Sequence, residues 1–404
     1  MFHEKGVRAL RERQDPKRRQ ARKAFARETV STAFVLDLAL SALDVRQDGD
    51  ETVGYRLRGR TSGNEDALIA YVVKEKGEYR IAGDDTSPQE LALRALRLAE
   101  KNELAAAKQW LDWARDHVAA GYDEDPLQSE PFATLWTRGR DASAEEIRLA
   151  AATLLPENKA SSAIALPILT EARATASPEI QTAIDQALLT AYGILENWTA
   201  LLSTAEGLEQ RYPASSRAFG EMSFALRKLN REDEVRTRAL ARLDRLRDDA
   251  TALRALGQVS IDRRNYEEAV RYYDRLLALA QATSYDYNLY SWTTLFVETE
   301  LSKAMEHALH AAALAPDNYA ILNTLAVVYA EQGKSSEARE TLLKSLEQKE
   351  NDSLQGADWY VVGRIAENYG ILDAAAEAYK HIEKQDVPGS TWELAQKRLT
   401  GLKR

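Results

Sequence analysis

Cysteine is absent from the 404 residues. The chain therefore forms no disulfides, offers no cysteine ligands for zinc and contains no thiol nucleophile, while its redox compartment stays undecided. Long apolar runs are also missing, because the most apolar stretch, residues 33–43, is short and is broken by Asp37. A stretch of that length does not cross a bilayer. The sequence thus indicates neither a transmembrane helix nor a covalently stapled fold.

The first thirty residues are rich in charge and show no apolar run after their basic part, so no signal peptide can be recognised. This pattern favours a cytoplasmic protein. The alternative is a segment of a longer exported protein, since the chain starts abruptly in a charged, helix-forming stretch.

Catalytic motifs are missing too. The sequence has no G-x-S-x-G elbow, Walker loop or H-E-x-x-H motif, and only five histidines. His307 and His310 share a helix face beside Glu306, but a metal site needs a third ligand from a facing helix and His381 lies far along the chain. We interpret this pair as a solvated or packing feature. We predict no enzymatic activity, no cofactor and no metal.

Charge is distributed unevenly along the chain. Residues 1–27 carry a net charge of +7, residues 28–86 carry −5, and the remainder carries −11, against −9 overall. An acidic segment from residue 87 onward argues against nucleic acid as its ligand, because phosphate neutralisation dominates such binding. The basic helix expected at 17–29 either contacts an anionic surface or nucleic acid, or packs as a lead-in helix on the next domain.

One set of spacings recurs between Leu253 and Tyr379. The first copy occupies offsets 0, 3, 4, 13, 16 and 20, with Leu253, Leu256, Gly257, Tyr266, Ala269 and Tyr273. Further copies are formed by Leu322, Leu325, Ala326, Ala338 and Leu342, by Trp359, Val362, Gly363, Ala375 and Tyr379, and more loosely by Leu295, Ala304, Ala308, Ala311 and Pro316. Offsets 0 and 3 line one face of a first helix. The small residue at offset 4 lets a second helix approach, and the residue at offset 20 fills the groove towards the next repeat.

This pattern resembles the tetratricopeptide repeat, a helix–turn–helix unit of about 34 residues. The resemblance implies a right-handed α-solenoid of about seven stacked helix pairs, whose concave side, formed by the first helix of each pair, holds a protein partner. The family's carboxylate clamp, with Lys and Asn recurring at set groove positions, is not present.

The resemblance places a candidate partner-binding groove at first-helix positions that packing does not use. These are Arg227, Arg254, Gln258, Tyr290, Thr293, Asn323, Val327, Tyr360 and Arg364. Tyrosine and arginine are the types that most often anchor interfaces. The three arginines favour an acidic or carboxylate-bearing peptide.

One copy departs from the pattern, because Trp292 stands where a small residue is expected. Either the two helices splay there, or the first helix is rotated. We expect Trp292 and Phe296 to lie in the core and Tyr290 to face the groove.

Ahead of the repeats, residues 28–86 alternate with a period of two and contain turn signals at 48–50, 61–64 and 76–77. They predict a small antiparallel meander, and the ending YVVKEKGEYRIAG resembles the last hairpin of α+β folds of the SnoaL and nuclear-transport-factor type. Ser87-Pro88-Gln89-Glu90 is a helix start, with a cap, a first-turn proline and a capping-box glutamate. We therefore expect a basic helix at 1–27, an α+β module at 28–86, repeats at 87–389, and a C-terminal capping helix at 390–404.

The favoured function is a non-catalytic scaffold that binds a protein or peptide in its groove. The alternative is a small-ligand or enzymatic site in the α+β module, carried by Tyr55, Tyr71 and the row Arg56, Arg58 and Arg60, with the repeats as a docking arm. A third hypothesis is attachment to nucleic acid or a membrane surface through residues 1–27. The oligomeric state is not encoded in any pattern that we recognise.

Overall fold

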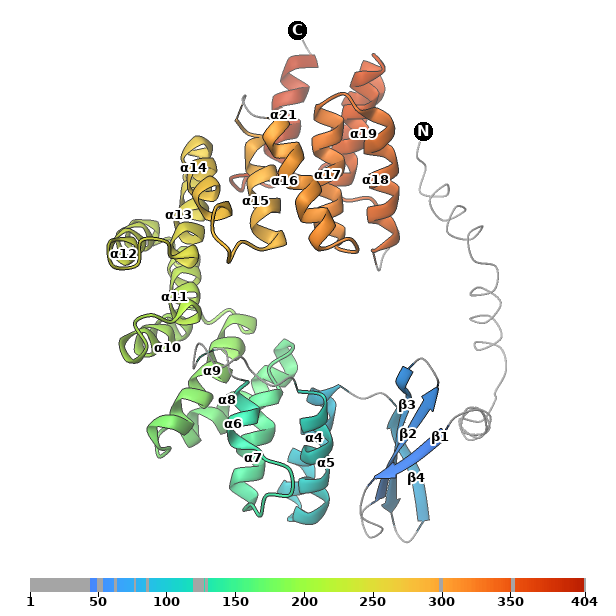
Figure 1. The fold of residues 1–404 in the computed structure, drawn as a ribbon, viewed down its shortest axis with the longest axis vertical. Helices are drawn as coiled ribbons and strands as arrows, with labels where there is room; N and C mark the ends of the chain where they lie inside the picture. The colour runs from blue at the N-terminus through green and yellow to red at the C-terminus, as the bar shows by residue number, and fades with distance from the viewer. Residues whose placement is uncertain are drawn as a thin grey trace. The chain divides into compact units, whose positions relative to one another are not determined.

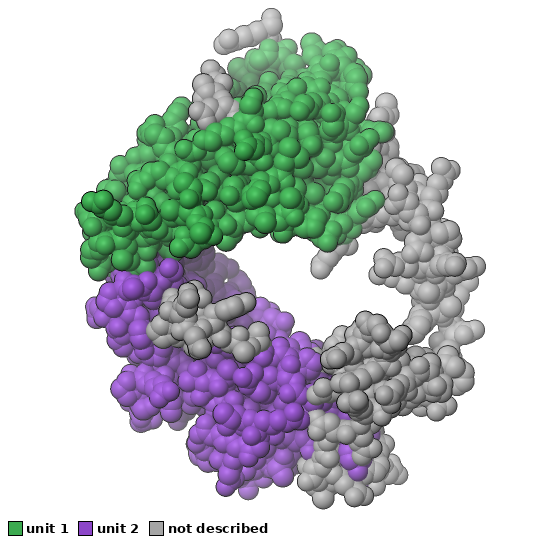
Figure 2. All heavy atoms as spheres, in the orientation of Figure 1, with its two compact units in different colours: residues 1–27, 230–404 green, residues 28–229 purple. Residues whose placement is uncertain are grey.

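The computed structural model describes residues 44–48, 54–61, 64–75, 78–84, 87–118, 127, 130–297, 301–349 and 353–402 (Figure 1). The predicted basic helix and the alternating stretch around residues 34–41 lie outside these residues. The described residues fall into two compact units, divided after residue 229 (Figure 2). Each unit is treated separately below. Within the described part of the chain, no helix combines the length and the apolar character needed to cross a bilayer.

The first unit begins with a four-stranded antiparallel sheet in the order β1-β2-β3-β4. The strands are β1 Asp44–Asp48, β2 Gly54–Thr61, β3 Asn64–Glu75 and β4 Glu78–Asp84. Sequence neighbours pair throughout, with Tyr55 opposite Val72 and Lys74 opposite Tyr79. This confirms the predicted meander.

The helices of the first unit follow the sheet. They are α4 Pro88–Glu100, α5 Leu104–Asp116, α6 Pro131–Leu135, α7 Ala144–Leu154, α8 Lys159–Arg173, α9 Pro178–Ile194, α10 Trp198–Arg211 and α11 Ser216–Lys228. The Ser87 hydroxyl accepts from the Glu90 amide, as the sequence predicted. Ser143 with Glu146 forms a capping box at the start of α7. Pro167 sits inside α8 without ending it.

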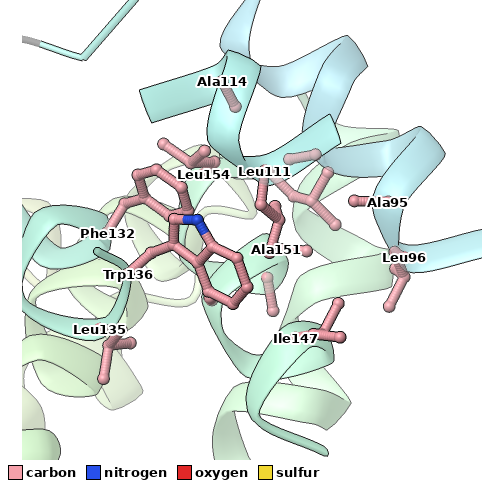
Figure 3. Close-up of a cluster of buried hydrophobic side chains, with 14 of the residues drawn as sticks. Ala95, Leu96, Leu111, Ala114, Phe132, Leu135, Trp136, Ile147, Ala151 and Leu154 are labelled. Carbon is pink, nitrogen blue, oxygen red and sulfur yellow. The ribbon is translucent and has the colours of Figure 1, made fainter. Parts of the chain in front are cut away.

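The segment between α5 and α7 is held by its own apolar residues. Phe132 and Trp136 are fully buried, and Leu135 nearly so. Figure 3 shows Phe132 and Trp136 facing Leu111 and Ala151 in one apolar cluster. The Trp136 indole donates to Asp112 Oδ1 at 3.0 Å, which satisfies its only polar group.

The second unit is an array of helix pairs. Its helices are α12 Glu232–Arg245, α13 Ala250–Asp262, α14 Tyr266–Leu277, α15 Ser284–Thr294, α16 Leu301–Leu314, α17 Tyr319–Glu331, α18 Ser335–Glu347, α19 Gly356–Asn368, α20 Leu372–Lys380 and α21 Thr391–Leu402. The helices from α13 to α20 pack in consecutive pairs, each pair a first and a second helix. The predicted α-solenoid architecture is confirmed.

The turns within pairs share one backbone feature. A residue in the left-handed region stands two positions before the second helix, at Asn102, Glu196, Arg264, Gly333 and Gly370. Glycine adopts this conformation freely, whereas other residues pay roughly 1–2 kcal/mol. Gly333 and Gly370 are glycines, whereas Glu196 and Arg264 are not.

The close approach of paired helices follows the predicted small residue. A Cβ added to Gly257 would lie 2.7 Å from the Tyr273 ring, and one added to Gly363 would collide with the Tyr379 ring. Where the small residue is Ala326, the partner at the equivalent place is the smaller Leu342, and both are buried. The large tyrosine side chains therefore stand opposite glycine, and the smaller leucine side chain stands opposite alanine.

The irregular copy at α15 is resolved by a one-residue shift. Ser291 takes the small position, and its hydroxyl donates to the Ala304 carbonyl of α16 at 3.0 Å. Since one residue is about 100° of helix rotation, Tyr290 moves into the core, where it is fully buried. Trp292 and Phe296 are half-buried and pack against an apolar core cluster, as expected. The expectation that Tyr290 faces the groove was wrong.

Candidate functional site

A cavity of about 750 Å³ lies on the face made by the first helices α15, α17 and α19. Its wall is built from Asn288, Leu289 and Trp292 of α15, from the first turns of α17 and α19, and from residues 381–392. The cavity is therefore bordered on one side by chain that comes after the last pair. Among the nine residues predicted for the groove, Asn323 lines it.

Asp358 organises the polar floor beneath this cavity. It is fully buried at the third position of α19 and accepts from the Gln355 amide at 2.8 Å, as part of a capping box. Asn323 Nδ2 at 2.7 Å, the Tyr319 hydroxyl at 3.0 Å and Lys349 Nζ at 3.0 Å also donate to it. Burial and the adjacent carboxylate raise the pKa of Tyr319 above its usual value. Both oxygens of Asp358 are thus held by structural donors.

The same arrangement links α13 and α15. Arg254 donates to both oxygens of the buried Asp286, at 2.6 and 2.8 Å, and Asp286 caps its own helix through Thr283. Arg254 and Asn323 are the fifth residues of their helices, and Asp286 and Asp358 the third. Two predicted groove positions therefore join successive first helices.

The chain after α20 turns back across the first-helix face. We call residues 381–402, which include α21, the return segment. The Trp292 indole donates to the Gly389 carbonyl at 2.8 Å, and the Tyr266 hydroxyl donates to Glu393 Oε2 at 2.7 Å. These contacts reach α15 and α14. The helix α21 also packs on α19 and α20, the last pair, which the predicted capping helix was expected to cover. Figure 1 shows α21 turned back along the array towards α15.

The other end of α21 is fixed by ionic contacts. Arg398 pairs with Glu331 of α17 and lies 3.9 Å from Glu367 of α19. Arg364 lies between the same two carboxylates, 2.9 Å from Glu331 and paired with Glu367. The Tyr360 hydroxyl donates to Glu331 at 2.7 Å, and burial, with that carboxylate, raises the pKa of Tyr360.

The middle of α21 is apolar. Leu394 and Ala395 are buried and belong to the same cluster as Val327 and Tyr360. The return segment thus binds its own array by an apolar stripe between two polar ends, which is the way amphipathic helices occupy protein grooves.

The predicted groove residues do not form one open surface. Tyr290, Thr293, Val327 and Tyr360 are at most 1% exposed, while Asn323 and Arg364 are buried and ion-paired or hydrogen-bonded. Arg254 and Gln258 are half-buried on α13, and Arg227 is half-buried in the first unit. Much of the first-helix face in this unit is used by packing and by the return segment.

The histidine pair on α16 has a packing role. The His307 ring meets the Tyr290 ring edge-on with centroids 4.6 Å apart, and His310 meets Tyr287 at 4.4 Å. Burial lowers the pKa of His307. In the part of the chain that the structure describes, no cluster of three metal-ligating side chains occurs.

The sheet is fixed to α5 by the residues that the alternative site required. Tyr71 is fully buried between Trp110 and Trp113, with ring centroids 5.3 and 5.2 Å away, and Arg56 pairs with Asp116 at 2.5 Å. The side chains of Arg58 and Arg60 lie outside the described residues.

One family model matches part of the second unit. The tetratricopeptide repeat family model matches residues 252–284, which span α13 and α14. No curated protein matches significantly.

Solved structures with a similar fold include three repeat proteins. PilF of Pseudomonas aeruginosa is 15% identical, with a TM-score of 0.40, and the alignment covers 52% of this chain and 90% of that one. PilW, described as a type IV pilus biogenesis factor, is 19% identical at 0.41, covering 49% and 90%. YrrB, described as having an unusual peptide-binding site, is 15% identical at 0.36, covering 44% and 89%. At these scores the alignments carry no conclusion about a partner.

Proposed function

We propose that this chain, which belongs to the tetratricopeptide repeat superfamily, is a protein-interaction scaffold that holds a segment of another protein on the first-helix face of α15, α17 and α19. The observation that carries the proposal is the return segment. That face already accommodates a polypeptide, with apolar burial at Leu394 and Ala395 and fixed polar contacts at both ends. A cavity of about 750 Å³ stays beside it.

The chemistry of the cavity suits non-covalent binding. Trp292 offers aromatic surface, and Asn288 offers an amide that can both donate and accept. The ionised groups of the floor, Asp358 and Lys349, are engaged with each other and position the helices. We propose no catalytic role, and the net charge of −11 from residue 87 onward disfavours nucleic acid.

The partner need not be acidic. That expectation depended on Arg227, Arg254 and Arg364, but Arg254 is saturated by Asp286, and Arg364 by Glu331 and Glu367. The alternative ligand site in the sheet is not favoured, because Tyr71 and Arg56 are used to dock the sheet.

A photo-cross-linking comparison tests the proposal. A photoreactive phenylalanine analogue replaces Leu289, which lines the cavity, or Leu309, which is 45% exposed on the second helix α16. We expect a protein adduct from position 289 and none from position 309 when the full chain is irradiated in an extract of its own cells. Equal adducts from both positions, or adducts from 309 alone, would refute the assignment.

A further inference from the structure

The ion cluster at the far end of α21 is unbalanced without the return segment. Glu331 and Glu367 have side chains only 9% and 13% exposed, and they share two guanidinium groups. Arg364 comes from α19 itself, whereas Arg398 is supplied by α21. Without α21, the two carboxylates would share the single positive charge of Arg364, which leaves one negative charge uncompensated.

We infer that the return segment is an intramolecular occupant of the partner site, and that the partner is an amphipathic helix carrying an arginine that replaces Arg398 between Glu331 and Glu367. This inference rests on the proposed function. It commits to a helical protein segment because a helix with that chemistry is already seated there.

The seated helix defines what the partner presents. Glu393 accepts from Tyr266 and lies 3.6 Å from the Arg264 guanidinium, and Arg398 follows five residues later, about 7.5 Å along the helix axis. The apolar residues between them face the array, as Leu394 does. A partner helix therefore carries an acidic residue, an apolar stripe, and an arginine five positions after the acid.

Tethering makes the return segment a strong competitor. A segment joined by a short linker has an effective concentration of about 1 mM. If the same segment binds from solution with a Kd of about 10 μM, the tethered copy weakens any competing helix about 100-fold. Access to the face is then set by how firmly α21 is held.

The test measures fluorescence anisotropy of a labelled synthetic peptide with the sequence of residues 388–402, added to the full chain. We compare the wild type with Arg398→Gln and with Gln396→Glu, an exposed position on α21 that receives the same change in net charge. A second variant, Glu393→Gln, loosens the opposite end, so the comparison does not depend on one substitution folding well.

We expect the peptide to bind Arg398→Gln and Glu393→Gln at least tenfold more tightly than the wild type and Gln396→Glu. A peptide that itself carries Arg398→Gln should bind at least tenfold more weakly. Equal affinity for all four chains, affinity that does not depend on the peptide's arginine, or no binding at all would overturn the inference. The cross-linking comparison at positions 289 and 309 tests the proposed function separately, so a failure of this inference can be told apart from a failure of the proposed function.

Discussion

Placing a methyl group at Gly257 examines the packing that builds every helix pair. The added Cβ would lie 2.7, 2.8 and 3.2 Å from three atoms of the Tyr273 ring. Tyr273 is fully buried and its ring is rigid, so neither side can yield without cost. Overpacking of this kind costs about 1–3 kcal/mol.

Alanine also has a higher helix propensity than glycine, by about 1 kcal/mol, which opposes the clash. Gly207 in α10 separates the two effects, because a Cβ there meets nothing within 4 Å. We expect Gly207→Ala to raise the free energy of unfolding by about 1 kcal/mol. The change caused by Gly257→Ala should be about 1–3 kcal/mol less favourable than the change caused by Gly207→Ala.

The native pair of Ala326 and Leu342 suggests the rescue. Adding Tyr273→Leu to the Gly257→Ala chain should relieve the clash, because leucine is smaller than tyrosine. A double-mutant cycle should then give a favourable coupling energy of about 1–3 kcal/mol. Urea denaturation followed by circular dichroism measures all four chains. If Gly257→Ala stabilises as much as Gly207→Ala, or the coupling is zero, the volume argument is wrong.

Three further predictions concern single groups. Asp358→Asn should lower the free energy of unfolding by about 3–5 kcal/mol, because it leaves the 7%-exposed Lys349 without its counterion. Asp386→Asn, in an exposed ion pair, should change the free energy of unfolding by less than about 1 kcal/mol in the same urea titration. Glu196→Gly should raise the melting temperature by about 2–4 °C, since it relieves a left-handed backbone in α9–α10, and an unchanged calorimetric transition would contradict this. Because burial lowers the pKa of His307, the unfolded chain binds more protons than the folded chain, so the free energy of unfolding should fall as the pH drops through about 6.5. In urea titrations between pH 7.5 and 5, His307→Phe should make the free energy of unfolding less dependent on pH. An equal pH dependence in wild type and variant would refute this role.

Much of the array could be predicted because its rules are local. The small residue at Gly257 and the aromatic at Tyr273 are 16 positions apart, within one unit, and their volumes must agree for two helices to touch. The capping boxes and the glycine turns depend on still shorter spacings. Periodicity therefore identified the pairs and the face made by their first helices.

The candidate site could be predicted only in part. The one-residue shift at Ser291 leaves the number of apolar residues in α15 unchanged, so the spacing placed Tyr290 in the groove, whereas it lies in the core. The contact between Tyr266 and Glu393 joins residues 127 positions apart. No local spacing encodes such a contact, although the break at residues 388–390 and the amphipathic helix after it are visible in the sequence. An unpaired amphipathic helix has to be covered by something, and here the covering surface is the array's own first-helix face.

Hydrogen exchange of the α21 amides, with and without the protein captured from position 289, tests the central claim most directly. The account predicts that the amides of residues 391–402 are protected in the free chain and exchange at least tenfold faster once the partner is bound. Protection of α21 that is unchanged or increased in the complex would contradict it.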